Sequence, residues 1–210
     1  ENYIRLQNDN ENNSLVSIIR KIEYGNKQLH QIATINQGIV SGADKVTNKH
    51  LLNYTLNSKK DDGIFTLSKD VYKDLDAISK IRNSSEVGML KPFYKNSDIF
   101  RFSTNCYVEK YILFLGKDIK NESELIRNFP LIYNHLKPFR QIMIDKRLSL
   151  NEKTEEWLTL NRGTGHPEIF VSTKIVCPQR SKTNTFGYNE CDWYATSDVF
   201  YITNSQKEYN

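Results

Sequence analysis

The fold class depends most on residues 169–202, which read IFVSTKIVCPQRSKTNTFGYNECDWYATSDVFYI. Short runs of Ile, Val, Tyr and Trp alternate in this stretch with Asn, Gly and Ser, which favour turns. The pattern predicts a β-rich meander that fills most of the chain after Arg147. Its strands are expected at Trp157–Leu160, Ile169–Val171, Lys174–Cys177, Thr185–Tyr188, Trp193–Thr196 and Val199–Ile202.

The residues before Arg147 mix helix and strand signals. Ser14, Thr47 and Ser68 can each cap a helix, and Pro130 can open another that Pro138 should kink. The expected helices cover 15–24, 48–54, the residues after Ser68 and those after Phe129; the expected extended segments are Leu29–Val40, Gly63–Leu67, Leu90–Tyr94 and 106–115. We therefore predict an α+β fold, in which a mixed N-terminal part and the β-rich C-terminal meander form one compact domain. This domain is expected to cover residues 14–210, after a polar connector at residues 1–13.

The composition excludes several classes of protein. The chain has 210 residues and a mass of 24.6 kDa, 26% of its residues are charged, and its mean hydropathy is -0.61. No apolar run approaches the ~20 residues of a membrane-spanning helix, so membrane, fibrous and disordered classes are excluded. The three cysteines, Cys106, Cys177 and Cys191, form no C-x-x-C pair, which fits the reducing cytoplasm. Because the chain begins with Glu1 and has no apolar leader, we interpret it as a piece of a longer protein.

The positive charge is concentrated in the middle of the chain. The net charge is +4, and residues 91–150 carry 11 Lys and Arg against 6 Asp and Glu. Residues 1–90 carry 12 against 11, and residues 151–210 carry 6 against 8. A positive middle third is compatible with a surface that follows phosphates, although an ordinary solvated surface explains the same charge.

Sequence motifs for catalysis are scarce. The chain has no G-x-G-x-x-G, P-loop, H-E-x-x-H or G-x-S-x-G, and its four histidines lack metal-ligand spacing. His135 lies on an apolar helix face, where a packed core histidine is expected. Asp98 together with Asp118-Ile119-Lys120 could hold Mg²⁺ as in metal-dependent nucleases, but such charges are also common in turns. The Glu155-Glu156 pair lies in a charged turn and predicts no catalysis.

Three stretches combine basic and amide side chains with aromatic residues at predicted loops. They are Gln37–Asn48, Lys91–Arg101 and Arg162–Asn184. Arg and Lys contact phosphates or guanine edges, and Asn and Gln can bind adenine through two hydrogen bonds. From these features alone, nucleic-acid binding and an ordinary polar surface are equally supported.

Five blocks in and beside these stretches carry a resemblance to a known family. They are INQGIVSGADK at 35–45, LKPFYKNSDI at 90–99, Phe129-Pro130-Leu131 through His135-Leu136 to Arg147, Trp157 with Leu160 and Arg162, and Phe170 with Lys174-Ile175-Val176 followed by Arg180-Ser181. In this order they resemble the TaqI-like C-terminal specificity domain, the target-recognition part of combined restriction-modification enzymes and related adenine-specific DNA methyltransferases. The resemblance spans residues 32–203, with Thr173 where that family usually has proline.

The resemblance implies recognition of a double-stranded DNA sequence, which positions a methyltransferase part for adenine methylation. An Asn-Pro-Pro-Tyr type motif and a glycine-rich cofactor loop are absent from the sequence, so this fragment is expected to be no enzyme and to hold no cofactor. S-adenosylmethionine, with Mg²⁺ if the parent also cleaves DNA, would belong to the parent enzyme. In this family the methyltransferase domain lies N-terminal to the specificity domain.

Eleven residues follow as DNA-binding candidates. The predicted backbone contacts are Lys45, Lys91, Arg101, Lys174 and Lys182; the predicted base-edge residues are Arg162, His166, Arg180 and Asn184; Asn48 is a further candidate of the first stretch, and Tyr94 or Phe93 is expected to stack or wedge. Gly38, Gly42 and Asp98 are expected to serve the scaffold.

Other functions remain open from the sequence. A metal-dependent nuclease domain would depend on Asp118. A protein-interaction module would ignore DNA even at low salt. A separate specificity subunit of a multi-subunit restriction system usually carries two recognition domains joined by long helices, and neither feature is evident here.

Overall fold

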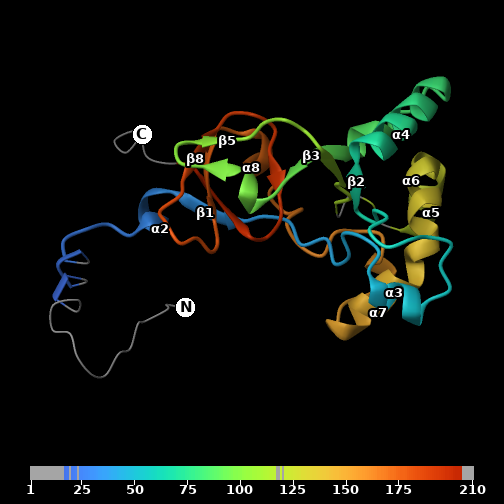
Figure 1. The fold of residues 1–210 in the computed structure, drawn as a ribbon, viewed down its shortest axis with the longest axis horizontal. Coiled ribbons are helices and arrows are strands. Elements are labelled where there is room, and N and C mark those ends of the chain that lie inside the picture. The colour runs from blue at the N-terminus through green and yellow to red at the C-terminus, as the bar shows by residue number, and fades with distance from the viewer. Residues whose placement is uncertain (1–16, 19, 23, 117–118, 120, 205–210) are drawn as a thin grey trace. The chain divides into compact units, whose positions relative to one another are not determined.

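The computed structural model describes residues 17–18, 20–22, 24–116, 119 and 121–204 (Figure 1). The chain divides into two compact units, Glu1–Thr34 with Asn204–Asn210, and Ile35–Thr203. In the smaller unit α2 covers Leu29–Ile32, and residues 17–18 and 20–22 are helical. The predicted connector at 1–13 and the capping residue Ser14 lie outside the described residues.

The described chain combines helices with antiparallel and mixed sheets, and runs of strands are followed by runs of helices, which confirms the predicted α+β class. The strands are β1 (Thr34–Gln37), β2 (Thr66–Ser68), β3 (Leu90–Tyr94), β4 (Ile99–Phe100), β5 (Ser103–Thr104), β6 (Lys110–Leu113), β7 (Lys174–Pro178), β8 (Gly187–Asn189), β9 (Tyr194–Ala195) and β10 (Val199–Thr203). The helices are α3 (Asn48–Asn53), α4 (Lys69–Ile81), α5 (Glu122–Asn128), α6 (Pro130–Leu136), α7 (Arg140–Ser149) and α8 (Glu168–Val171). Short 3₁₀ turns are η1 (Glu86–Met89), η2 (Asn96–Asp98), η3 (Lys137–Phe139) and η4 (Thr154–Glu156). Among the described residues, no helix combines the length and the apolar character that a membrane crossing requires.

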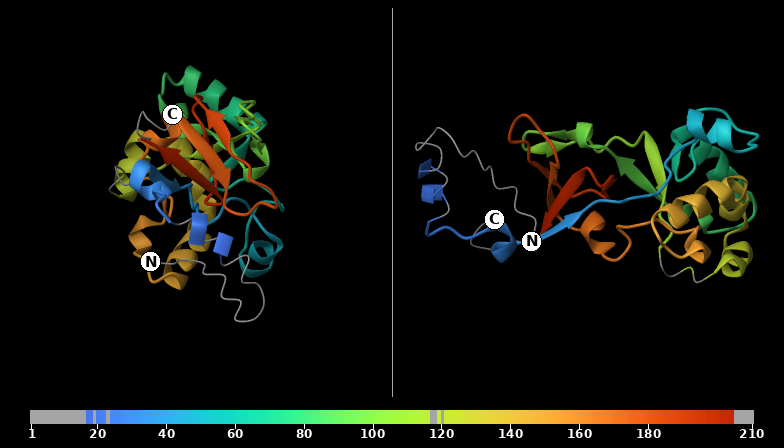
Figure 2. Two further views of the ribbon diagram at one scale, coloured as in Figure 1. Left: turned by 90° about the vertical axis from the view of Figure 1, so that its left-hand side faces the viewer. Right: turned by 90° about the horizontal axis from the view of Figure 1, so that it is seen from below.

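Two four-stranded sheets organise the larger unit. One has the order β2-β6-β3-β9, with β6 antiparallel to both of its neighbours and β9 parallel to β3. The other has the order β1-β10-β7-β8, in which β7 is antiparallel to β8 and to β10. Figure 2 shows β7 and β10 side by side, in orange and red. Because β9 and β10 follow each other closely but belong to different sheets, the residues between them connect the two sheets.

The close contact between the backbone at Gly38 and the segment that connects β9 to β10 requires a glycine. The Gly38 amide donates to the Val199 carbonyl at 2.9 Å, and the next amide, that of Ile39, donates to the Ala195 carbonyl at 2.8 Å. A Cβ atom on Gly38 would lie 2.3 Å from the Thr196 carbonyl oxygen. Gly38 therefore serves the scaffold, because a side chain at this position would force the two segments apart.

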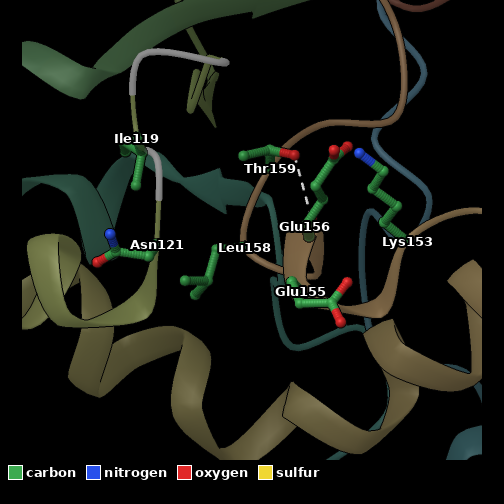
Figure 3. Close-up of a pocket in the computed structure, with 7 residues that line it drawn as sticks. All are labelled: Ile119, Asn121, Lys153, Glu155, Glu156, Leu158 and Thr159. Atoms are coloured by element: carbon green, nitrogen blue, oxygen red, sulfur yellow. Dashed lines mark hydrogen bonds between the residues drawn. The ribbon is translucent and has the colours of Figure 1, made fainter.

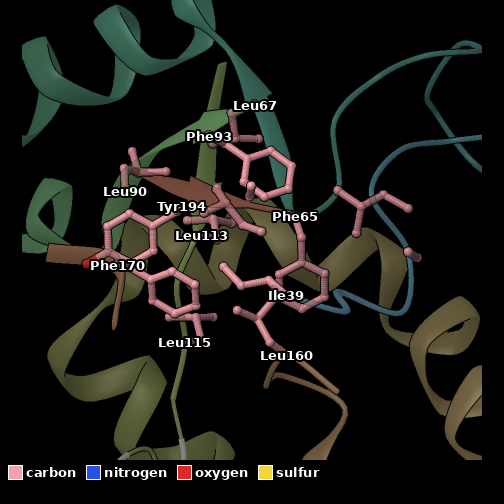
Figure 4. Packing of buried hydrophobic residues seen from close by; sticks show 14 of the residues in the cluster. Ile39, Phe65, Leu67, Leu90, Phe93, Leu113, Leu115, Leu160, Phe170 and Tyr194 are labelled. Carbon is pink, nitrogen blue, oxygen red and sulfur yellow. The ribbon is translucent and has the colours of Figure 1, made fainter. Parts of the chain in front are cut away.

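A shared apolar core joins the sheets and the helices. Figure 4 shows Phe65, Leu113 and Leu115 packed together with Phe170 and Tyr194, although these residues are far apart in the sequence. The Phe170 and Tyr194 rings stack with centroids 4.7 Å apart. Burial of many large side chains in one cluster is the main force that stabilises this unit.

The local start and stop signals in the helical part are confirmed. The Thr47 hydroxyl accepts the His50 amide at 3.3 Å where α3 begins, and the Ser68 hydroxyl accepts the Val71 amide at 3.4 Å where α4 begins. Pro130 is the first residue of α6, and Pro138 lies in η3, which interrupts the helix before α7. His135 lies in the core as predicted, where its Nε2 is 2.9 Å from the Ile64 carbonyl oxygen.

Several predicted strands are wrong or shorter than expected. Ile169–Val171 lies in α8, because Pro167 holds a helical φ of -62° at the position before that helix. Trp157–Leu160 is buried throughout, but it follows η4 as a turn in which the Leu160 amide donates to the Leu115 carbonyl at 3.3 Å. The extended segment predicted at 106–115 contains a strand only at Lys110–Leu113. The extended segment predicted at Leu29–Val40 begins instead with the helix α2.

Candidate nucleic-acid interface

The β4-β5 hairpin presents a turn formed by Arg101, the last residue of the second predicted stretch, and Phe102. Asp98 fixes the base of this hairpin: its carboxylate accepts the Lys95 amide at 2.8 Å and the Asn105 side-chain amide at 3.2 Å. The Asp98 carbonyl also accepts the Asn105 amide at 2.8 Å. Asp98 is therefore committed to the local structure, as predicted.

The hairpin turn docks on the segment that leads into β8. The Phe102 amide donates to the Phe186 carbonyl at 2.7 Å, and the Tyr188 amide donates to the Phe102 carbonyl at 3.4 Å. Gly187 permits this approach, because a Cβ atom there would lie 2.5 Å from the Ser103 carbonyl oxygen. The residues just after the second and the third predicted stretches, distant in the sequence, are thus joined at one surface.

We call this surface the hairpin surface and define it as residues 100–102, the loop 179–186 and Tyr188. The loop contains Arg180 and Lys182 but no Asp or Glu. Its polar side chains Arg180, Lys182 and Asn184 are all exposed. The aromatic side chains of the hairpin surface are also exposed, with fractions of 53% for Phe100, 74% for Phe102, 46% for Phe186 and 52% for Tyr188. Cationic, amide and aromatic groups are therefore interleaved on one solvent-facing surface.

The Arg101 side chain contributes both charge and a flat group to the hairpin surface. Its guanidinium carbon lies 4.9 Å from the centroid of the Phe102 ring, within the range of a cation–π interaction. The side chain is exposed. A guanidinium held over a ring keeps free N–H donors at its edge, which suits contacts with phosphates or guanine.

The other exposed candidates do not all join the hairpin surface. Arg162 exchanges backbone hydrogen bonds of 3.1 and 3.2 Å with Val40, so it joins the first predicted stretch to the third. His166 is exposed, with Nδ1 3.1 Å from a Glu168 carboxylate oxygen. Asn48 is exposed in the first turn of α3, and Lys91 is half-buried in β3.

Three residues predicted to contact DNA are buried in this structure and are therefore not available to a ligand. Tyr94 is 2% exposed, its ring stacks on Trp193 at 5.0 Å, and its hydroxyl donates to the Cys106 carbonyl at 3.1 Å. Phe93 is 5% exposed, so neither aromatic residue can wedge into DNA without leaving the core. Lys174 is 2% exposed, and its Nζ donates to the Ser172 and Cys191 carbonyls at 2.8 and 2.7 Å. These side chains stabilise the fold.

Burial makes Lys174 a pH-dependent element of stability. Desolvation lowers the pKa of Lys174 to about 8, against the opposing effect of Asp192 and the Cys191 and Cys106 thiols. Above that pH the folded state releases the proton while the unfolded state keeps it, so the free energy of unfolding rises with pH. Relative to Lys174→Met, the unaltered chain should gain about 1.5 kcal/mol between about pH 8 and about pH 9.5. Urea unfolding of both proteins across this range measures the difference, and a constant difference would contradict the assignment.

A second group of exposed cations joins the predicted contact Lys45 to two lysines, Lys95 and Lys110, that the sequence did not single out. Lys95 and Lys110 line a concavity of 200 Å³ together with Tyr107, and β3 places Phe93 opposite Lys110. Burial first, and then the nearby charges of Lys95 and Lys45, lower the pKa of Lys110. Lys45 also forms an ion pair with Asp61. We call Lys45, Lys95 and Lys110 the lysine cluster; the excess of positive charge in residues 91–150 was its signal in the sequence.

A larger concavity is lined by charged and polar residues. It measures 440 Å³ and is lined by residues that include Asn121, Lys153, Glu155 and Glu156 (Figure 3). In Figure 3 the Thr159 hydroxyl bonds the Glu156 carbonyl, at 3.0 Å. Within the part of the chain that the structure describes, no three or more His, Cys, Asp or Glu side chains are grouped so that they could hold a metal ion. Asp118 and Lys120, the remaining nuclease candidates, lie outside the described residues.

Comparisons with known proteins place the fold among those of restriction-modification enzymes. No protein-family profile matches the chain. Over 180 residues it is 26% identical to the type II methyltransferase M.MjaIV of Methanocaldococcus jannaschii, covering 83% of this chain and 50% of that protein. The chain therefore spans about half the length of this curated relative. A solved structure of the Type IIL restriction-modification enzyme MmeI in complex with DNA aligns with a TM-score of 0.50 and 12% identity, over 86% of this chain and 20% of that one.

Proposed function

We propose that this chain is the DNA target-recognition domain of an adenine-specific DNA methyltransferase, of the TaqI-like C-terminal specificity type. The observation that carries the proposal is the hairpin surface, because the Phe102 and Phe186 backbones, which lie just beyond the ends of two predicted DNA-binding stretches, bring Arg101 and the loop 179–186 onto one surface. The names of the relatives support the same class, since one is a type II methyltransferase and the other a restriction-modification enzyme solved with DNA. A domain of this kind positions a catalytic domain on a chosen site, where the target base leaves the stack.

The proposed contacts with the duplex are of two chemical kinds, those with base edges and those with phosphates. Arg180 and Asn184 carry side-chain groups that read base edges, and each good pair contributes about 1–3 kcal/mol of discrimination. Arg101, expected from the sequence to contact the backbone, keeps that role. Lys182 and the lysine cluster would contact phosphates, which gives affinity and salt dependence but no sequence preference. Arg162, His166 and Asn48 are exposed but lie outside the hairpin surface, so we propose them as contacts elsewhere on the domain.

The catalytic parts of the parent enzyme are proposed to lie elsewhere in it. The sequence contains no glycine-rich cofactor loop and no Asn-Pro-Pro-Tyr type motif, so we expect this chain to bind no S-adenosylmethionine. That cofactor, with Mg²⁺ in a parent that also cleaves DNA, would bind the methyltransferase or nuclease part. The chain itself would then contribute recognition alone, and the methyltransferase domain would be its partner.

Arg180→Ala and Lys182→Ala should weaken DNA binding in different ways. On a duplex that the unaltered chain selects from a random library, Arg180→Ala should reduce the preference for that sequence about tenfold, because it removes a base-edge contact. Lys182→Ala should weaken selected and unselected duplexes equally and lower the slope of log Kd against log salt by about 0.9, since one phosphate contact is lost. Fluorescence anisotropy across a salt series measures both quantities.

An exposed lysine outside the proposed contacts provides the matched control. Lys137→Ala removes the same charge from η3 and should leave affinity and sequence preference unchanged. If the Arg180 and Lys182 variants bind like the Lys137 variant, the loop 179–186 does not contact DNA. Binding to no duplex at low salt would favour a protein-interaction module instead, and Mg²⁺-dependent cutting would favour a nuclease.

A further inference from the structure

Phe102 has an unusual backbone conformation for its residue type. Its φ is 73°, in the left-handed region that a residue with a Cβ atom rarely adopts. Among the described residues, the other non-glycine residues with positive φ are Asp61, Asn83, Asn151 and Asn204, whose short side chains tolerate this region. Phe102 therefore occupies a position for which Asn or Gly would be the ordinary choice.

The surrounding structure holds Phe102 in this conformation and directs its ring outward. The amide and the carbonyl of Phe102 are both bonded, to Phe186 and Tyr188 respectively, and Gly187 allows the close approach. The side chain is 74% exposed, so the ring contributes little to the core. An exposed ring adds little burial to offset the free-energy cost of the left-handed backbone at Phe102. Strained backbone of this kind is concentrated at functional sites.

The charges beside the ring indicate what kind of partner it meets. The Arg101 guanidinium lies over the ring, and the neighbouring loop supplies Arg180 and Lys182. The Glu190 carboxylate accepts the Tyr188 hydroxyl at this surface, so three cations stand against one carboxylate and the net charge is positive. A positive surface with a protruding aromatic ring suits a polyanion whose interior is made of stacked flat groups, and duplex DNA has this construction. Phe100, Phe186 and Tyr188 flank the ring and would cover the widened groove.

We propose that Phe102 is a wedge, whose ring inserts between adjacent base pairs when the hairpin surface binds duplex DNA. This proposal rests on the proposed function and extends it, because it assigns the chain a role in deforming the DNA as well as reading it. Insertion unstacks one base step and kinks the duplex, and the bend brings more of the basic surface onto the phosphates. The sequence predicted this stacking or wedging role for Phe93 or Tyr94, and we propose Phe102 in their place.

Phe102→Asn separates the wedge from a structural role. Asparagine tolerates the left-handed backbone, so the midpoint of thermal unfolding should stay the same or rise by about 2 °C. Affinity for the duplex that the unaltered chain selects should fall about tenfold, because the stacking contact is lost. Phe102→Tyr keeps the ring and should retain the affinity. Ile81→Ala, which shortens an apolar side chain that is 86% exposed in α4, serves as the control for lost apolar surface.

A single mismatch moved through the selected duplex gives the readout specific to a wedge. Mismatched pairs cost less to unstack, so the unaltered chain should bind about tenfold tighter when the mismatch lies at the inserted step. Phe102→Asn should lose this preference, and Phe102→Tyr should keep it. Equal affinity of Phe102→Asn and the unaltered chain, or a mismatch preference that survives in Phe102→Asn, would overturn the wedge and leave DNA recognition intact. Failure of the unaltered chain to bind any duplex would overturn the proposed function, and the wedge with it.

Discussion

Arg147→Ala is expected to lower the free energy of unfolding by about 3 kcal/mol, because it removes a buried guanidinium that bonds a carboxylate and a buried backbone carbonyl. The Arg147 side chain is 3% exposed. Its guanidinium donates to the Glu152 carboxylate at 2.5 Å, to the Thr159 carbonyl at 2.6 Å and to the Thr159 hydroxyl at 3.1 Å. Loss of the guanidinium would leave a carboxylate and a buried carbonyl without their donors. Urea unfolding followed by circular dichroism measures the loss.

Two substitutions near Arg147 serve as controls for this result. Lys146→Ala alters the preceding residue of α7, which is exposed, and should change the free energy of unfolding by less than about 0.5 kcal/mol. Glu152→Gln removes the charge of a partner that is 30% exposed and should cost about 1 kcal/mol. If Arg147→Ala costs no more than Lys146→Ala, then Arg147 does not connect α7 to Thr159.

Glu86→Ala is expected to cost about 3 kcal/mol, because it uncovers the N-terminus of α6 inside the protein. One Glu86 carboxylate oxygen accepts the Leu131 and Ile132 amides at 2.8 and 3.1 Å, and the residue is 2% exposed. Phe129, the residue before α6, has no side-chain acceptor to replace it. The negative charge also interacts favourably with the positive end of the helix dipole.

Glu86→Gln tests the acceptor separately from the charge. The amide keeps one oxygen that can accept the same two N–H groups, so a loss of about 1 kcal/mol is expected in denaturant unfolding. Equal losses for the Ala and Gln variants would assign the effect to charge alone. No loss in either variant would show that α6 needs no acceptor from η1.

Local signals in the sequence predicted the helical part well. Thr47, Ser68 and Pro130 act within three or four residues, so capping and proline chemistry fix these helix starts without knowledge of the tertiary fold. Trp157–Leu160 was mispredicted for the opposite reason. Four buried residues in a row resemble a strand, but here the burial follows from packing against Leu115 and Arg147.

The candidate site was harder to predict, because the blocks that resemble the specificity-domain family mostly mark the scaffold. Gly38 meets the Thr196 carbonyl, Phe170 is fully buried, and Lys174 donates to two backbone carbonyls. Exposure decides which basic and aromatic residues are available to a ligand, and exposure depends on tertiary contacts. Phe102 became prominent only because its hairpin docks beside Gly187.

The central claim is that the chain recognises a DNA sequence, and selection from a randomised duplex library tests it most directly. The purified 210-residue chain would be enriched on the library at low salt and again at higher salt. We predict one enriched motif that contains adenine and that persists as non-specific binding is removed by salt. Salt-sensitive binding without an enriched motif would contradict sequence recognition. Retention of no duplex at low salt would contradict DNA binding altogether.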